Sequence, residues 1–143
     1  LYMGESVIIN ILNINNISFI KDYKFPKFKN MLFDFYLPNL NLIIEFDTIQ
    51  HSKPIKYFGG QIKYELTRKH DVIKTFHCIK NKIPILRISH QDIENVSEIL
   101  LPIINNIELE ENDYSEENYV IYSNPENYKS FIDDLKKYME FNS

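Results

Sequence analysis

The sequence has little or none of three features that commonly define the class of a protein. It contains one cysteine, Cys78, so no disulfide can form within the chain and a reducing compartment is favoured. No apolar run approaches the roughly 18 residues of a membrane span, and no signal-peptide pattern opens the chain. No G-x-x-x-x-G-K motif follows a predicted strand, which excludes a P-loop nucleotide site. We therefore expect an intracellular protein without membrane segments, in the cytoplasm or with the nucleoid or nucleus.

Length and composition are those of an ordinary globular domain. The chain has 143 residues, of which 44% are hydrophobic and 25% charged. Because it starts at Leu1 and not at methionine, we expect further domains of a longer chain. Residues 1–106 hold 13 Lys and Arg against 10 Asp and Glu, whereas residues 107–143 hold 3 against 10. The first part therefore carries +3, which permits nucleic-acid binding, and the second carries −7.

Acidic residues interrupt two apolar runs in the first third of the chain. Asp34 lies at the centre of the run from Met31 to Leu37, and Glu45 and Asp47 lie in and after the run from Leu42 to Phe46. Such runs are typical of strands covered on both faces, where an uncompensated carboxylate costs several kcal/mol. In a hairpin the three acids would converge and repel one another unless a cation such as Mg²⁺ lay among them. The alternative is that each acid ends a strand or pairs with a nearby lysine.

The order Asp34, Glu45-Phe46-Asp47, Gln50-His51 resembles the PD-(D/E)XK nuclease superfamily. Residues 4–100 are most similar to the very-short-patch-repair endonucleases and the EDxHD homing endonucleases. The resemblance implies a restriction-endonuclease-like α/β core that binds Mg²⁺, with Mn²⁺ able to substitute. It implies Asp34 and Glu45 as metal ligands, together with the backbone carbonyl of Phe46. Asp47 stands where the superfamily usually has lysine, and we expect it to bind the metal or to support its ligands.

The EDxHD pattern adds further residues to this expected site. The residues that match its letters are Glu5, Asp34, Asp47, His51 and Asp71. The resemblance implies that His51 acts as general base, that Asp71 orients it, and that Glu5 reaches the metal site. Lys74 would contact the scissile phosphate in place of the lysine absent at position 47. Simpler readings remain: Glu5 favours the helix dipole, and Asp71 with Lys74 forms an i,i+3 surface pair.

Lysines lie near aromatic residues in two segments beside the expected site. The first segment contains Lys24, Lys27 and Lys29, and the second, directly after His51, contains Lys53 and Lys56. Lysines can bind phosphates while aromatic rings stack on bases, so both segments are candidates for nucleic-acid contact. The alternative is that they form solvated loops, in which lysines are common.

Hydrophobic periodicity predicts helices and strands in alternation. The predicted elements are a helix over 4–14, strands over 17–25, 31–37 and 42–46, a helix over 61–82, a strand over 83–89 and a helix ending near 101. In the long helix Ile62 and Leu66 belong to the predicted inner stripe, and Arg87 in the next strand is expected to form an ion pair. Residues 106–123 read as an acidic linker. Asn124 then caps a final amphipathic helix, which packs on the core or on a partner.

These expectations lead to an α/β domain with a mixed central sheet flanked by helices. Residues 1–106 would form a nuclease-like core, and residues 107–143 an acidic linker and a C-terminal helix. The resulting hypothesis is a Mg²⁺-dependent endodeoxyribonuclease whose partner is DNA. The alternative is a catalytically silent nucleic-acid-binding or scaffolding domain of a larger protein.

Overall fold

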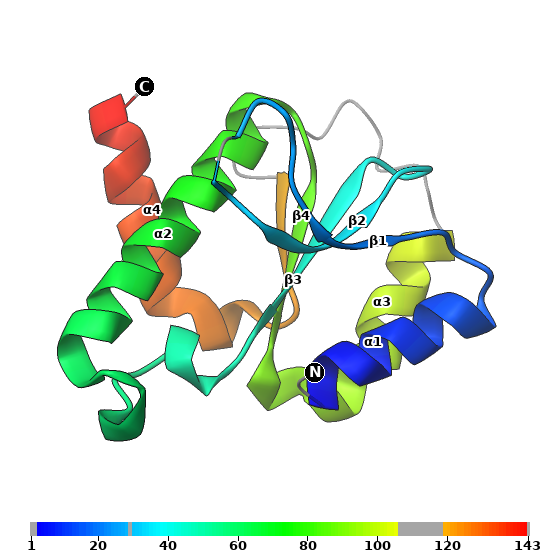
Figure 1. Ribbon diagram of the computed structural model, residues 1–143, viewed down its shortest axis with the longest axis horizontal. Helices are drawn as coiled ribbons and strands as arrows, with labels where there is room; N and C mark the ends of the chain where they lie inside the picture. Colours follow the sequence, from blue (N-terminus) through cyan, green and yellow to red (C-terminus); the bar gives the residue numbers. More distant parts are fainter. Residues whose placement is uncertain (1–2, 29, 106–118, 143) are drawn as a thin grey trace.

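The computed structural model describes residues 3–28, 30–105 and 119–142. Their five strands form one sheet with the order β1-β2-β3-β4-β5, as Figure 1 shows in part. The strands are β1 (Ile20–Tyr23), β2 (Phe33–Leu37), β3 (Leu42–Asp47), β4 (Ile85–Ser89) and β5 (Val120–Tyr122). The first three are antiparallel neighbours, whereas β3, β4 and β5 run parallel. The predicted α/β class with a mixed sheet is confirmed.

Helices cover both faces of the sheet (Figure 1). On one face lie α1 (Met3–Ile14) and α3 (Val96–Asn105), which pack on Phe35, Ile44 and Leu86 in one core cluster. On the other face lie α2 (Gly60–Lys80) and α4 (Lys129–Asn142), which share a second cluster with Ile43 and Ile85. Within the described residues, short 3-10 helices connect these elements: η1 (Ile49–His51), η2 (Lys56–Phe58), η3 (His90–Asn95) and η6 (Pro125–Tyr128). None of the described helices is long and apolar enough to cross a membrane.

The β2–β3 hairpin forms where the sequence places it. Its turn closes with hydrogen bonds from the Leu40 amide to the Leu37 carbonyl and from the Asn41 amide to the Pro38 carbonyl. Asn41 has a φ of 49°, a left-handed conformation that asparagine adopts more readily than most residues. All six residues of β3 are buried, because β2 and β4 flank the strand and helices cover both faces of the sheet. The two acids of β3 are therefore inside the protein.

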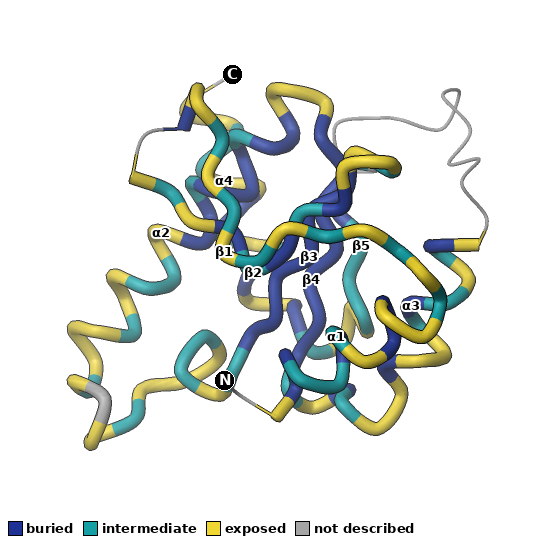
Figure 2. Tube along the Cα trace, turned by 45° about the vertical axis from the view of Figure 1, so that its right-hand side comes forward, coloured by how far each residue is buried: buried dark blue, intermediate teal, exposed yellow. Residues whose placement is uncertain are grey.

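The first half of α2 differs from its predicted packing. Ile62 and Leu66 are 73% and 60% exposed, so their place in an inner stripe was wrong. Helix α2 is longer than the sheet face that it covers, and its buried residues begin at Asp71. Residues 52–69, called the arm below, project away from the sheet as a largely exposed lobe (Figure 2).

The last part of the chain adds a strand that the sequence did not reveal. Residues 120–122, predicted as linker, form β5, which pairs with β4 along Ile85, Leu86 and Arg87. The acidic run of residues 108–117 lies outside the described residues. The side chain of Asn124 accepts a hydrogen bond from the Glu126 amide, as its predicted role as a cap requires. Helix α4 then packs beside α2, with Phe131 and Leu135 buried.

We predict that α4 contributes to the free energy of unfolding through Phe131, which is 4% exposed. Phe131→Ala should lower this free energy by roughly 3–5 kcal/mol, because it removes a buried ring and leaves a cavity. The measurement is urea unfolding followed by circular dichroism. Phe141→Ala is the matched control on the same helix, since Phe141 is 89% exposed, and it should change stability by at most about 0.5 kcal/mol. Equal effects of the two variants would show that α4 does not pack as described.

Candidate active site

Asp34 and Glu45 come together from adjoining strands at the floor of an open cleft. The last paired residues of the hairpin on this side are Phe35 and Ile44, and the two acids are the residues next to them. One carboxylate oxygen of Asp34 accepts a hydrogen bond of 2.8 Å from the backbone amide of Phe46. Glu45 is 3% exposed. Both acids line the cleft, whose volume is about 300 Å³.

The ionised forms of both carboxylates are disfavoured in this position. Burial and the charge of Asp34 raise the pKa of Glu45 to about 8, although Lys74 and Arg87 act in the opposite direction. Burial also raises the pKa of Asp34, against the lowering effect of the Phe46 amide and a hydrogen bond with Glu45. Two neighbouring carboxylates, which repel each other when both are ionised, are the kind of oxygen donor set that Mg²⁺ or Mn²⁺ prefers. The residues present therefore fit such a cation.

Lys74 supplies a positive charge to this pair of acids. It projects from α2 and is 7% exposed, which is unusual for lysine and is explained by its partners. Its Nζ lies 2.7 Å from Oε1 of Glu45 and 4.8 Å from the centre of the Phe33 ring. The expected alternative, an i,i+3 surface pair of Asp71 with Lys74, does not describe these contacts. Lys74 is a buried cation at the cleft floor.

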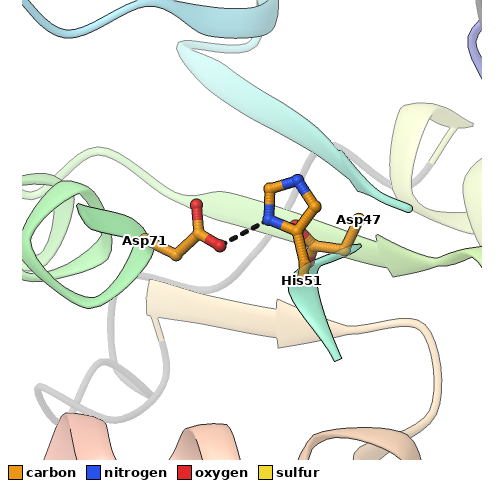
Figure 3. Close-up of side chains that lie close together, drawn as sticks. All are labelled: Asp47, His51 and Asp71. Atoms are coloured by element: carbon orange, nitrogen blue, oxygen red, sulfur yellow. Dashed lines mark hydrogen bonds and ion pairs between the residues drawn. The ribbon is translucent and has the colours of Figure 1, made fainter. Parts of the chain in front are cut away.

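His51 and Asp71 form a hydrogen-bonded pair at the side of the cleft. His51 ends η1, just after β3, and Asp71 lies on α2, so the pair joins two elements (Figure 3). Nδ1 of His51 lies 2.5 Å from Oδ2 of Asp71, and Nε2 points away from that carboxylate. Burial would lower the pKa of His51, but the hydrogen bond and charge of Asp71, with the charge of Asp47, raise it above 6.5. The acceptor at Nδ1 leaves Nε2 available to take a proton.

Asp47 is placed apart from the other two proposed ligands. Arg87 donates to both of its carboxylate oxygens, at 2.9 Å and 2.7 Å, and the Tyr128 hydroxyl donates at 2.8 Å. Arg87 thus forms the ion pair that the sequence suggested. Side-chain atoms of Asp47, His51 and Asp71 lie within 4.8 Å of one another, a spacing that could hold a metal. Because Arg87 already occupies both oxygens of Asp47, this group reads as a hydrogen-bond network and not as a metal centre.

Glu5 reaches the cleft from α1. It pairs with Lys21 at 3.1 Å and lines the cleft together with Asp34. The helix can approach β3 closely because residue 4 is glycine: a Cβ there would lie 2.1 Å from the ring of Phe46. A larger residue at position 4 would displace the helix that carries Glu5, or the strand that carries Glu45.

The predicted nucleic-acid-binding lysines that the structure describes lie outside the cleft. Lys24, Lys27, Lys53 and Lys56 are exposed, and Lys29 lies outside the described residues. Four residues that the sequence analysis missed line the cleft instead, namely Thr48, Lys63, Thr67 and His70. Lys63, Thr67 and Asp71 are spaced by four on α2, so helical periodicity from Asp71 could have identified the first two.

We predict that Glu45 makes the stability of the metal-free protein fall with pH. Its pKa is raised from 4.5 to about 8, so its full contribution is present below about 4.5 and is lost as pH rises towards about 8. The loss is at most about 1.4 kcal/mol per pH unit. Glu45→Gln removes the titration, so the free energy of unfolding of the variant minus that of wild type should increase with pH. Urea unfolding across this range tests it, and a difference independent of pH would contradict it.

No family model, no curated protein and no solved structure matches this chain.

Proposed function

We propose that the chain is a metal-dependent DNA endonuclease of the PD-(D/E)XK type. The observation that carries the proposal is that Asp34 and Glu45 share one open cleft with the His51–Asp71 pair. A cation site and a general base within one cleft are the two parts that metal-assisted phosphodiester hydrolysis needs. Lys74 adds a third part, a buried cation beside the acids.

Asp34 and Glu45 would hold Mg²⁺, and Mn²⁺ is able to substitute because both are hard cations that prefer oxygen ligands. The backbone carbonyl of Phe46 is the third donor that the resemblance implies, and Phe46 also lines the cleft. When bound, the cation supplies positive charge to the scissile phosphate and makes a nearby water more acidic. In this proposal Asp47 is not a ligand, because Arg87 and Tyr128 engage it.

His51 is the proposed general base. Nε2 takes a proton from the attacking water, whose oxygen forms a bond to phosphorus while the bond from phosphorus to the 3′ oxygen breaks. The 3′ oxygen leaves as an oxyanion and takes a proton from a solvent water, giving 5′-phosphate and 3′-hydroxyl ends, as the resemblance implies. Asp71 accepts a hydrogen bond from Nδ1, which fixes the tautomer and stabilises the imidazolium that forms. Glu5, which pairs with Lys21 and lines the cleft, is proposed to hold a water.

Lys74 is proposed to bind the scissile phosphate. Its Nζ is held by Glu45 at the cleft floor, so it is fixed before substrate arrives. Position 47, where the superfamily usually has lysine, holds an acid in this chain. The positive charge beside the acids is therefore supplied by α2 and not by β3.

The arm is the proposed contact surface for the DNA backbone. It carries exposed Lys53, Lys56 and Lys63, the last of which also lines the cleft. Tyr57 is 94% exposed between them, so its ring is free to pack against the nucleic acid. Exposed lysines next to a cleft bind phosphates without regard to base sequence. Lys24 and Lys27 lie in the segment after β1, whose Phe28 contacts His77 near the other end of α2, so they form a separate candidate surface for nucleic-acid contact.

One observation favours a second candidate, a catalytically silent nucleic-acid-binding or scaffolding domain. The residue at the usual lysine position is an acid that Arg87 and Tyr128 hold away from the cleft. Such a replacement would also arise in a domain that had lost catalysis but kept its fold. Cleavage of plasmid DNA in Mg²⁺ that EDTA abolishes separates the two functions, because a silent domain would bind without nicking.

We predict that Asp34→Asn and Glu45→Gln each abolish cleavage while the protein still folds. Both changes remove a negative charge that the cation requires and keep the size of the side chain. The measurement is nicking of supercoiled plasmid in Mg²⁺ or Mn²⁺. Asp133→Asn is the control. Asp133 is an exposed acid on α4 that does not line the cleft, so this variant should cleave like wild type. Normal cleavage by either cleft variant would disprove the metal assignment.

We predict that His51 sets the acidic limb of the pH–rate profile. Because the pKa of His51 is raised above the ordinary 6.5, its base form predominates only at higher pH, and the acidic limb should lie above pH 6.5. Asp71→Asn removes a carboxylate that stabilises the imidazolium, so the limb should move to lower pH. The measurement is kcat against pH at saturating DNA.

A second variant checks that this limb belongs to His51. His51→Ala should lower kcat by roughly 10²–10⁴-fold, the usual contribution of a general base, and should leave DNA affinity little changed. A variant that binds DNA weakly but cleaves at the normal rate when saturated would mean that His51 contacts substrate instead.

A further inference from the structure

We infer that Tyr128 is a positioning residue for the catalytic histidine, so that the C-terminal segment, residues 119–142, completes the active site. The inference rests on the proposed function and extends it, because this segment lies outside the part of the chain that resembles nucleases. The juxtaposition that carries it is the contact of the Tyr128 hydroxyl with Asp47, four residues before His51.

The contact of Tyr128 with Asp47 is buried and specific. Tyr128 is 6% exposed and Asp47 is 5% exposed, and the hydroxyl donates to Oδ2 of Asp47 at 2.8 Å. The two residues are 81 positions apart in the chain. A hydroxyl buried in such surroundings needs an acceptor, and this carboxylate is the acceptor it has.

Asp47 in turn lies close enough to His51 to disturb it. Oδ1 of Asp47 is 3.6 Å from Nδ1 of His51, whereas Oδ2 of Asp71 is 2.5 Å from the same nitrogen (Figure 3). Two carboxylates therefore compete for one proton on the ring. Arg87 and Tyr128 together fix the Asp47 carboxylate at the longer distance. Loss of the Tyr128 hydrogen bond would leave this carboxylate held by Arg87 alone, and a shift of Oδ1 towards Nδ1 would make His51 divide its hydrogen bond between two acceptors.

Tyr128 is itself fixed by a set of contacts within the C-terminal segment. Its ring packs against Tyr122 and Phe131, with centroids 4.9 Å and 6.1 Å away. The residue before it, Asn127, donates to both oxygens of buried Asp92 at 3.1 Å. Contacts of the ring and hydrogen bonds of the preceding residue therefore fix Tyr128, and a fixed tyrosine can keep its hydrogen-bond partner in place. This rigidity is what a positioning role requires.

A second contact of the same segment fixes the helix that carries Asp71. Nη1 of Arg68, on α2, donates to the Ser130 hydroxyl and to Asp134 of α4, each at 2.9 Å. Arg68 lies three residues before Asp71. Both acceptors around His51 are thus fixed from the C-terminal segment, Asp47 directly through Tyr128 and Asp71 through the helix.

The experiment compares wild type, Tyr128→Phe and Tyr122→Phe as full chains. Tyr128→Phe keeps the ring that packs against Tyr122 and Phe131 and removes only the hydroxyl. Tyr122→Phe is the matched control, because it removes a neighbouring hydroxyl of the same segment while the bond from Tyr128 to Asp47 stays in place. Thermal unfolding first identifies a temperature at which all three chains are folded. Steady-state cleavage of plasmid DNA in Mg²⁺ and the ¹⁵N resonances of the His51 ring, at one fixed pH, are then measured.

We expect Tyr128→Phe to lower kcat by about 10- to 100-fold with little change in KM, because the base is misplaced while DNA contacts are intact. Its His51 ring resonances should shift or broaden, and those of Tyr122→Phe should match wild type. Wild-type kcat together with unchanged His51 resonances in Tyr128→Phe would overturn the inference. If wild type does not cleave at all, the proposed function fails, and the resonances alone still decide whether Tyr128 positions His51.

Discussion

The guanidinium of Arg87 is the charge on which the rest of the structure depends. It is fully buried in β4, and a buried cation costs several kcal/mol unless it is well paired. Asp47 of β3 provides that pairing with two hydrogen bonds, and Asp71 of α2 lies 3.4 Å away. These charges raise the pKa of Arg87 well above its ordinary value despite burial. Sheet, helix and cleft are therefore joined around this one charge, and removing Asp47 would leave Arg87 with only the longer contact to Asp71.

The acids of the site divide into two groups with different charge balance. Asp47 and Asp71 face Arg87 and a protonated His51, so that group is neutral when the histidine is charged. Among the described ion pairs, the one that Asp34 or Glu45 makes joins Glu45 to Lys74. Negative charge is therefore in excess when both acids are ionised. A divalent cation is attracted to the second group and repelled by the arginine in the first. Charge balance thus favours the hairpin acids as the cation site.

The sequence predicted those features that depend on local patterns. Asp34 and Glu45 stood out because alternation and apolar neighbours place them inside strands, and the structure brings both into one cleft. Strand β5 was missed because three residues beside an acidic run carry little signal, and its pairing with β4 is distant in sequence. Ile62 and Leu66 were misplaced because helical periodicity does not show where the sheet beneath a helix ends. An ion pair of Arg87 was predicted, but its partner Asp47 and the contact of Tyr128 with the same carboxylate were not, since these residues lie 40 and 81 positions from Asp47.

The acid at position 47 changes which elements the proposed chemistry depends on. With lysine there, β3 alone would carry both the metal ligand and the neighbouring positive charge. With aspartate, the positive charge comes from Lys74 of α2, and the aspartate requires Arg87 of β4 and Tyr128 of η6 as partners. The spacing between β3 and α2 then has to be maintained by packing, because no single strand fixes it. Helix α4 packs against α2 and supplies Asp134 and Ser130 to Arg68, which makes residues outside the region that resembles nucleases part of the same proposed mechanism.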